Sequence, residues 1–400
     1  MGSRISRPSE PSSIFSSPHL PVDIYLDIVN HLQTSLEEDR KALLSLSLCC
    51  RALRDASQRV LFRNMRYGYR QTTDAERRNH TLKIHAKFLR AIVGSPERLA
   101  LYVFSYAQNG LALQPKSRSI AKALTLDHRK DVQLWRLIEQ ALPLMVNLKN
   151  LNFASVVHHP SAPILLRKCG FQLEGLTWRG VGSEEELYTN FLATQHRLLH
   201  ININSSSYIN KPPLPDGLCP SLTSIACSLL DFARLSATRP IVALQVGNDA
   251  ADIPRASHTD VMSASERERC ITALKRIRYL QLWALPPFYR FTRGIILQEV
   301  TVLQLCVWNI EDTSLLQQFP NLQYFQLWDP RLYGFDTSTH QAIAARAFDY
   351  CPKLQRVLIV ESVAHSWADL VWRFFPRYEG GINMELTSMD NYNESMWWKI

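Results

Sequence analysis

Glycine is scarce in this sequence, with 14 residues in 400, and no glycine-rich phosphate-binding loop is present. The short motifs that mark nucleotide binding, zinc proteases and serine hydrolases are missing as well. His158 and His159 form the one histidine cluster, and no third ligand follows at a spacing useful for metal binding. We therefore expect no enzyme activity, no cofactor and no metal, and we favour a loop for this histidine pair.

Long apolar runs are also missing. No stretch of about 18 apolar residues occurs, so the sequence predicts no membrane-spanning helix. Residues 1–19 are rich in Ser and Pro and lack the apolar segment of a secretory signal, which predicts a disordered tail. Gly2 fits a loose myristoylation pattern. None of the eight cysteines forms a C-x-x-C pair, which favours reduced, buried thiols in a cytoplasmic or nuclear protein.

The excess of positive charge is local. The net charge is +9, and residues 51–90 hold eleven basic and three acidic residues, a difference of +8. A basic patch of this kind can bind nucleic acid, and it can equally face an acidic protein partner. Both interpretations stay open.

Residues 20–62 predict three short helices. Ile24, Ile28 and Leu32 recur every four residues, as on the apolar face of an amphipathic helix. Similar periodicities follow over residues 40–50 and 53–62. A helical unit of this size buries only a marginal core. We therefore expect it to need a partner, or the domain that follows, to complete its burial.

An ordered set of short segments runs through these helices: Leu20-Pro21, Asp27-Ile28-Val29, Lys41-Ala42-Leu43, Leu46-Ser47-Leu48, Cys50-Arg51, Leu53-Arg54 and Leu61-Phe62. The set resembles an F-box of the kind abundant in fungi. The resemblance implies docking on a Skp-type adaptor of a cullin–RING ubiquitin ligase. It implies adaptor contacts for Leu20, Pro21, Ile28, Leu32, Leu46, Leu48 and Cys50. The alternative is a helical cap that only seals the end of a repeat domain.

A pattern of apolar residues, Φ-x-x-Φ-x-Φ, recurs through the rest of the chain. The clear copies are Leu148/Leu151/Phe153, Leu173/Leu176/Trp178, Leu198/Ile201/Ile203, Leu222/Ile225/Cys227, Ile241/Leu244/Val246, Ile277/Leu280/Leu282, Val300/Leu303/Leu305, Leu322/Phe325/Leu327 and Leu354/Val357/Ile359. Most of the spacings lie at or near the about 20–29 residues of leucine-rich repeats, and the pattern resembles the degenerate repeats behind many F-boxes.

The expected fold class is therefore α/β, with a short three-helix F-box followed by a leucine-rich-repeat-like solenoid with a curved parallel sheet. The expected order is a tail over residues 1–19, the helical hook over 20–62, a basic linker or helix over 63–98 and the solenoid over 99–400. A generic α/β domain remains an alternative.

Several finer features are also expected: weaker repeats at Leu99/Tyr102/Phe104 and Ala121/Leu124/Leu126, a capping box at Ser263 and Glu266, a helix over 367–375, and a last strand over 382–386.

In such a solenoid, the side chains between the apolar ones point to the concave face. Near the C-terminal end these are amide and aromatic residues, which we expect to form the target-binding site: Tyr279, Gln281, Trp283, Gln304, Tyr324, Gln326 and Trp328. Exposed Trp and Tyr are favoured interface anchors. Equally, the rings could pack under a loop or under the tail around Trp397 and Trp398.

These expectations together favour a substrate-recognition subunit of a ubiquitin ligase that has no active site of its own. It would hold an unknown protein target on the repeats. Two other functions stay open: a repeat scaffold without a ligase link, and a nucleic-acid binder acting through residues 51–90.

Overall fold

The computed structural model describes residues 21–34, 37–68, 75–111, 128–155, 162–179, 186–204, 217–235, 239–246, 262–282, 285–306, 310–328, 337–362, 370–378, 381–382 and 385–387. These residues form a mixed α/β fold with one mostly parallel sheet, the class that the sequence predicts. The expected tail over 1–19, the weaker repeat at 121–126 and the two residues Trp397 and Trp398 lie outside the described part.

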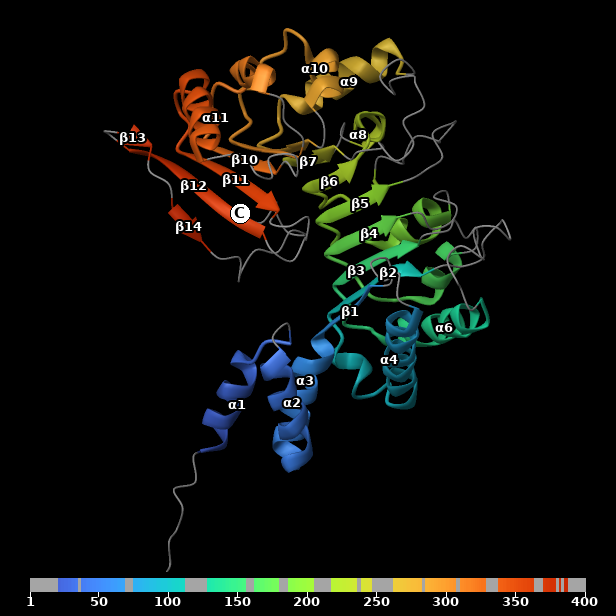
Figure 1. Ribbon diagram of the computed structural model, residues 1–400. Coiled ribbons are helices and arrows are strands. Elements are labelled where there is room, and N and C mark those ends of the chain that lie inside the picture. The colour runs from blue at the N-terminus through green and yellow to red at the C-terminus, as the bar shows by residue number, and fades with distance from the viewer. Residues whose placement is uncertain are drawn as a thin grey trace, which may run out of the picture.

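Three helices open the described chain: α1 (Val22–His31), α2 (Glu37–Cys49) and α3 (Arg51–Arg63). Pro21 directly precedes α1, where its missing N–H costs no helical hydrogen bond. Cys50 separates α2 from α3 because its backbone is extended, with φ −151° and ψ 169°. α3 packs against both α1 and α2. The three expected helices are therefore present, at the blue end of the chain in Figure 1.

The strands that follow pair in parallel, each with the next one along the chain. They are β1 (Asn64–Gly68), β2 (Ser105–Leu111), β3 (Asn150–Ser155), β4 (Gly175–Arg179), β5 (His200–Asn204), β6 (Ser224–Cys227), β7 (Ala243–Val246), β8 (Tyr279–Leu282), β9 (Val302–Leu305), β10 (Tyr324–Trp328) and β11 (Arg356–Ser362). The nine clear sequence repeats supply β3 to β11 in order, as predicted.

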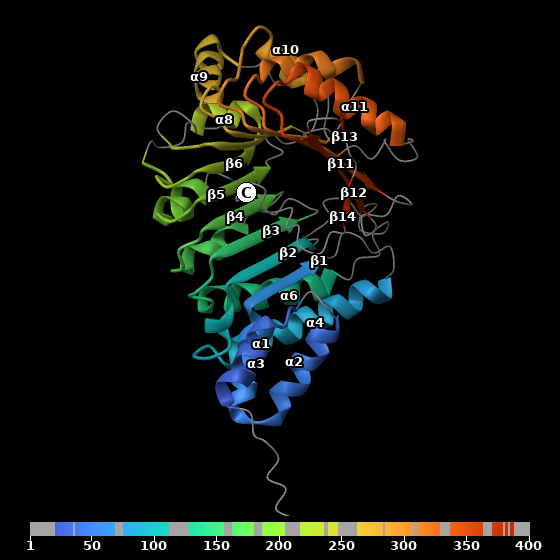
Figure 2. The same cartoon turned by 90° about the vertical axis from the view of Figure 1, so that its left-hand side faces the viewer.

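Helices connect the strands. The longer ones are α4 (Ala75–Gly94), α6 (His128–Ala141), α8 (Leu229–Leu235), α9 (Ala264–Leu274), α10 (Leu285–Thr292) and α11 (Thr337–Tyr350). Short 3-10 or π-helical turns are η1 (Ala100–Tyr102), η2 (Leu142–Leu144), η3 (Ala162–Lys168), η4 (Leu187–Phe191), η5 (Leu192–Thr194) and η8 (Ile310–Gln318). In Figures 1 and 2 the sheet follows an arc, and the helices lie on its outer side.

The core lies between the sheet and these outer helices. The middle apolar residue of each repeat faces it and is at most 2% exposed: Leu151, Leu176, Ile201, Ile225, Leu244, Leu280, Leu303, Phe325 and Val357. Because successive side chains of a strand point to opposite faces, the residues between them face the inner side of the arc. The predicted burial of the repeat cores is therefore confirmed.

One backbone arrangement recurs at the start of the strands. The Lys149 carbonyl accepts hydrogen bonds from the N–H groups of Glu174 and Gly175, at 2.7 and 3.0 Å. The equivalent carbonyl in every strand connection from Phe104 to Gln323 accepts the same pair of N–H groups from the next strand. These hydrogen bonds join successive repeats just before their strands begin. Every repeat is therefore held to the next at the equivalent residue.

The predicted capping box is present at the start of α9. The Ser263 side chain accepts from the Glu266 N–H at 3.3 Å, and the Glu266 carboxylate accepts from the Ser263 N–H at 3.0 Å. Each bond satisfies a donor that a helix N-terminus leaves unpaired, which is why this sequence starts a helix here.

The C-terminal end of the sheet corrects one expectation. Residues 370–378 form the strand β12 (Leu370–Tyr378), which pairs antiparallel with β11, and not the helix expected over 367–375. β12 also pairs with β13 (Gly381–Ile382) and β14 (Glu385–Thr387), so the expected last strand is present in part. Arg377 anchors β12, because its guanidinium donates to the carbonyls of Pro352 and Phe348 on the neighbouring connection.

The start of the sheet corrects two further expectations from the sequence. Within the expected linker or helix over 63–98, residues 64–68 form β1 and belong to the sheet. The helix expected in this region is present as α4, and it buries Leu82, Leu89 and Ile92 in the main core. The sheet therefore begins directly after α3. The first weaker repeat is displaced by four residues, since Val103, Tyr106 and Gln108 take the positions expected for 99, 102 and 104.

Candidate functional site

The helical hook, expected over residues 20–62, consists of α1 to α3, which run from Val22 to Arg63. It buries very little of its own surface. Val29 of α1 and Leu43 of α2 are its buried apolar side chains among the described residues, joined by Ser57 of α3. Neither Val29 nor Leu43 belongs to the main core under the sheet. So small a core contributes little stability of its own. We therefore expect a partner, or the domain that follows, to cover the apolar surface that the hook leaves exposed.

Large apolar side chains remain exposed on two helices of the hook. On α1, Ile24 and Ile28 are 42% and 49% exposed, and on α2, Leu44 and Leu48 are 51% and 82% exposed. Each pair is spaced four residues apart, so its members share one helix face. Burying a Leu or Ile side chain is worth about 1.5–3 kcal/mol. Both helices pack on α3, and exposed apolar surface on such a unit favours a protein interaction site.

The predicted adaptor contacts fall into three groups. Pro21, Ile28, Leu48 and Cys50 are exposed, while Leu32 and Leu46 are half-buried. Leu20 lies outside the described residues. Ile24 and Leu44 were missed as candidates, although their spacing from Ile28 and Leu48 is visible in the sequence. The signal that distinguishes them is exposure, which a helical periodicity alone does not give.

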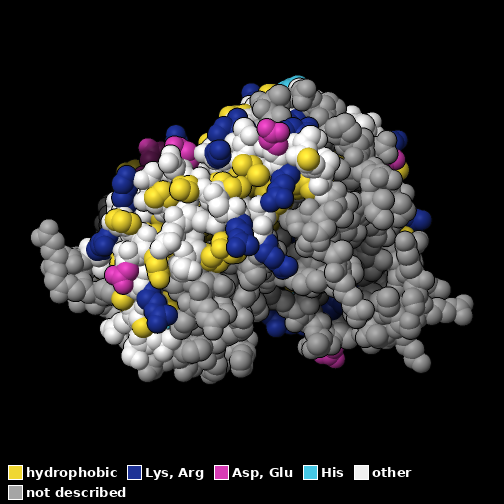
Figure 3. Space-filling model, turned by 90° about the horizontal axis from the view of Figure 1, so that it is seen from above, with side chains coloured by type: hydrophobic (Ala, Val, Ile, Leu, Met, Phe, Trp, Pro, Cys, Tyr) yellow, Lys and Arg dark blue, Asp and Glu magenta, His cyan; other side chains and the backbone are white. Residues whose placement is uncertain are grey.

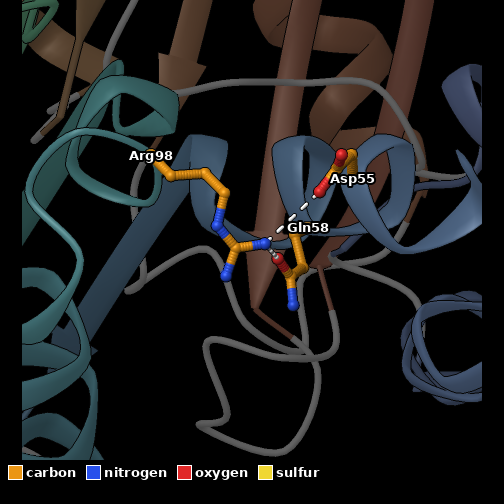
Figure 4. A network of polar contacts seen from close by, with 3 residues as sticks. All are labelled: Asp55, Gln58 and Arg98. Carbon is orange, nitrogen blue, oxygen red and sulfur yellow. Dashed lines mark hydrogen bonds and ion pairs between the residues drawn. The ribbon is translucent and has the colours of Figure 1, made fainter. Parts of the chain in front are cut away.

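The hook is fixed to the first repeats through α3. The Arg98 guanidinium donates to the Gln58 side chain at 2.8 Å and pairs with Asp55 at 3.3 Å (Figure 4). On the same helix, Arg59 lies 5.6 Å from the centre of the Tyr102 ring, and Arg63 stacks on Phe104 in the same way. Part of the basic character of residues 51–90 therefore holds the hook in place.

The other basic residues are distributed over the surface. Lys83, Lys87 and Arg90 are exposed on one face of α4. Over the outer face near α9 to α11, Lys and Arg are more numerous than Asp and Glu, but they are dispersed among apolar and uncharged groups (Figure 3). A nucleic-acid site usually shows a concentrated basic patch or stripe. Among the described residues, the stripe of Lys83, Lys87 and Arg90 on α4 fits this description.

The inner face of the sheet carries an aligned row of uncharged side chains. Strand pairing places Gln245, Gln281, Gln304 and Gln326 side by side on β7 to β10. The same row continues through Asn152, Thr177, Asn202 and Ala226 on β3 to β6. Neighbouring strands are about 4.8 Å apart, so these amide groups adjoin one another.

The structure brings most of the predicted target-binding residues together. Tyr279 and Tyr324 lie in one row, with Val302 between them. Tyr324 is exposed, and Tyr279 and Trp328 are half-buried. Gln281, Gln304 and Gln326 are only 6–9% exposed. Trp283 lies outside the described residues.

The glutamine row is therefore less open than a bare sheet face. Gln281 Nε2 donates to the Cys306 sulfur at 3.9 Å, and Gln281 Oε1 is buried with no hydrogen-bond partner among the described residues. A buried amide oxygen without a partner costs about 1–3 kcal/mol. A donor from a bound partner would remove this cost. This observation favours the binding of a partner at the glutamine row. Tyr324, next to the row, is exposed and can contact such a partner.

A second group of polar residues lies in the core and has a structural role. His85 of α4 and the Tyr106 hydroxyl share a 2.7 Å hydrogen bond, and the His85 ring stacks on Tyr67 at 3.9 Å. Burial lowers the pKa of His85 to about 3, so the imidazole is neutral. These residues join α4 to β1 and β2 and are closed off from solvent.

The described residues contain no group of three or more His, Cys, Asp or Glu side chains placed to hold a metal ion. None of the described helices has both the length and the apolar character needed to cross a bilayer.

No family model matches this chain, and no curated protein matches it either. Function must therefore be inferred from the hook and from the inner face of the sheet.

Proposed function

We propose that this chain is the substrate-recognition subunit of an SCF-type cullin–RING ubiquitin ligase. Its hook binds a Skp-type adaptor as an F-box does, and its leucine-rich-repeat-like solenoid holds a target protein. The observation that carries the proposal is the exposed apolar surface of Ile24, Ile28, Leu44 and Leu48 on a three-helix unit with almost no core of its own.

The solenoid half of the proposal is supported by repetition. Each strand pairs with the next in chain order, and the same pair of backbone hydrogen bonds ties successive connections. Units of this kind cannot bury their own apolar faces and form a continuous core by stacking. Such a stack presents a long inner surface, which suits a binding role better than a catalytic one.

The mechanism that follows is positional. α3 ends at Arg63 and β1 begins at Asn64, so no linker separates the adaptor-binding unit from the target-binding sheet. A target on the sheet is thereby held at a fixed place relative to the ligase. Holding both reactants on one assembly makes the transfer of ubiquitin effectively intramolecular. Residues of the target site, Tyr324 and Trp328 among them, supply binding energy only.

Two experiments separate this function from its rivals. Ile24→Asp with Ile28→Asp should abolish co-purification with a Skp-type adaptor, because two charges would enter an apolar contact. Asn30→Asp adds a charge elsewhere on α1 and should leave co-purification intact. A chain that never retains the adaptor would be a repeat scaffold instead. Salt-dependent retention on DNA or RNA, lost on replacing Lys83 and Lys87, would favour the nucleic-acid binder.

A further inference from the structure

The parallel sheet has one open edge, at its first strand. Among the described strands, β1 pairs with β2 alone, and it lies at the end of the arc nearest the hook (Figures 1 and 2). The other end of the parallel sheet is covered, because β12 pairs antiparallel with β11 along its full length. β1 is therefore the end of the parallel sheet at which a further strand would pair.

The backbone groups of β1 point alternately toward β2 and away from it. The Arg63 carbonyl accepts a hydrogen bond at 3.0 Å from the N–H of Phe104, the residue that leads into β2. The N–H and C=O groups of Met65 and Tyr67 therefore also point toward β2. Those of the three intervening residues point away from it: Asn64, Arg66 and Gly68. Among the described residues, no backbone hydrogen bond to another element occupies these outward groups.

All three outward positions are exposed. Gly68 shows this for the backbone itself, because glycine has no side chain that could account for its exposure. A Cβ atom placed on Gly68 would meet nothing within 4 Å apart from its chain neighbours. Native sheets usually protect an open edge with proline, a bulge or several charges. β1 has no proline, a regular register with β2 and a single charge, Arg66, so little on this strand opposes pairing.

The side chains along β1 define what an added strand should carry. Arg66 is exposed on the inner face and makes no hydrogen bond or ion pair among the described contacts. Met65, on the opposite face, is half-buried and packs against the main core. Residues of an added strand stand about 4.5–5.5 Å from their counterparts across the pair. A carboxylate beside Arg66 and an apolar side chain beside Met65 therefore suit this edge.

We propose that the open edge of β1 binds an extended segment of the target polypeptide by strand addition. The segment carries an acidic residue beside Arg66 and apolar residues at the two neighbouring positions. Because β1 has five residues, about five residues of the segment can pair with it, over about 16 Å. Main-chain hydrogen bonds supply the affinity, and the alternating side chains supply the specificity. The carboxylate is favoured because a guanidinium binds it with two parallel hydrogen bonds.

A second copy of this chain fits the edge less well. Two β1 strands paired antiparallel about their centres would bring their two Arg66 side chains directly opposite each other, where like charges are destabilising. The inference rests on the proposed function, because it assigns the edge to the target. Since β1 begins directly after α3, a segment bound there lies beside the hook and close to the ligase.

The test uses the full chain and labelled 11-residue peptides in which Ser and Gly flank the core Thr-Val-Glu-Val-Thr. Fluorescence anisotropy measures binding. Replacing the central Glu of the peptide with Lys should weaken binding at least about tenfold. Arg66→Glu should reverse this preference, whereas Arg346→Glu, an equal charge change at an exposed position of α11, should preserve it.

N-methylation of the peptide tests strand addition itself. Alternate N–H groups of a strand face the same side, so one set bonds to β1 and the other does not. Methyl groups on the two Val nitrogens, or on the nitrogens of the central Glu and the first Thr, should therefore differ at least about tenfold in their effect on binding. In the free chain, the amides of Arg66 and Gly68 should exchange with solvent faster than that of Tyr67, and bound peptide should slow them.

Four outcomes would overturn the inference. They are the absence of peptide binding, equal binding of the Glu and Lys peptides, equal effects of the two N-methylation patterns, and exchange at Arg66 that bound peptide leaves unchanged. Competition between the peptide and a dimer of the chain would replace the target segment with a second copy. Adaptor binding, measured on the same samples, reports on the hook alone, so failure of the proposed function is distinguishable from failure of this inference.

Discussion

Arg98 and Asp55 lie 43 residues apart in the chain, yet their side chains meet at 3.3 Å and join the first repeats to the hook. Both side chains are about half exposed. Exposed ion pairs are typically worth about 0.2–1 kcal/mol, so the contact orients the hook more than it stabilises the fold.

Arg98→Ala should therefore lower the free energy of unfolding by less than about 1 kcal/mol, as measured by urea denaturation. Its larger effect should be faster hydrogen exchange in α1 to α3, because the hook loses a tether. Lys41→Ala, which breaks another exposed ion pair with Glu38, is the control and should leave exchange in α3 unchanged. Equal exchange in the two variants would contradict the tether.

Leu303→Ala should destabilise the chain by about 2–5 kcal/mol, because the side chain is fully buried in the repeat core. Val302→Ala, at the next residue on the inner face, should cost much less. Urea denaturation followed by circular dichroism measures both. A similar loss of unfolding free energy in the two variants would contradict the difference in burial between the core face and the inner face of the sheet.

The folded chain should lose stability as pH falls below about 6.5. His85 stays neutral in the fold because burial lowers its pKa to about 3, while in the unfolded chain it takes up a proton near pH 6.5. Between these values the unfolded state binds more protons, so this contribution is complete above pH 6.5 and is lost toward pH 3. The slope for one proton is at most about 1.4 kcal/mol per pH unit.

Urea denaturation at pH 7.5 and 5.5 measures this slope. His85→Gln should flatten it, and His80→Gln, at an exposed position of the same helix, should not. If His85→Gln fails to fold, an NMR titration of the His85 ring in the natural chain gives the same information. A ring that titrates near pH 6.5 would contradict the buried position.

The thiols should report on adaptor docking. Cys49 and Cys50 are exposed at the end of α2, beside Leu48, contrary to the buried role expected for them. Burial raises the pKa values of Cys270 and Cys351 to about 12, so these thiols should resist alkylation. Iodoacetamide with mass spectrometry should therefore label Cys49 and Cys50 in the free chain. Bound adaptor should protect Cys50, and unchanged labelling would argue against docking at this place.

The repeat strands could be predicted because their apolar spacing is local. Each copy of the pattern is defined by six consecutive residues, and all nine clear copies have apolar residues at its three apolar positions. The strand at β2 was misaligned because Gln108 occupies a position where the pattern requires an apolar side chain, and Leu99 offered an apparently better start. β1 was missed although Phe62, Met65 and Tyr67 fit the pattern, because their basic neighbours favoured a linker.

The features that escaped prediction depend on distant contacts. Residues 370–378 are apolar enough for a helix, and only pairing with β11 makes them a strand. The glutamines of the inner face were expected to be open, but long side chains in register cover one another, which a single strand cannot show. Exposure of Leu44 and Leu48 likewise depends on how α2 packs on α3, whereas their shared helix face follows from spacing alone.

The central claim is that the hook binds a Skp-type adaptor through its exposed apolar side chains. Isothermal titration of the full chain with purified adaptor tests it most directly. The account predicts a one-to-one complex, and at least about a hundredfold weaker binding for Leu44→Asp with Leu48→Asp, since anchors of this kind commonly cost about 2 kcal/mol each. Ser45→Asp, an exposed position on the same helix, should bind as the natural chain does. No measurable binding by the natural chain, or equal binding by the double variant, would contradict the account.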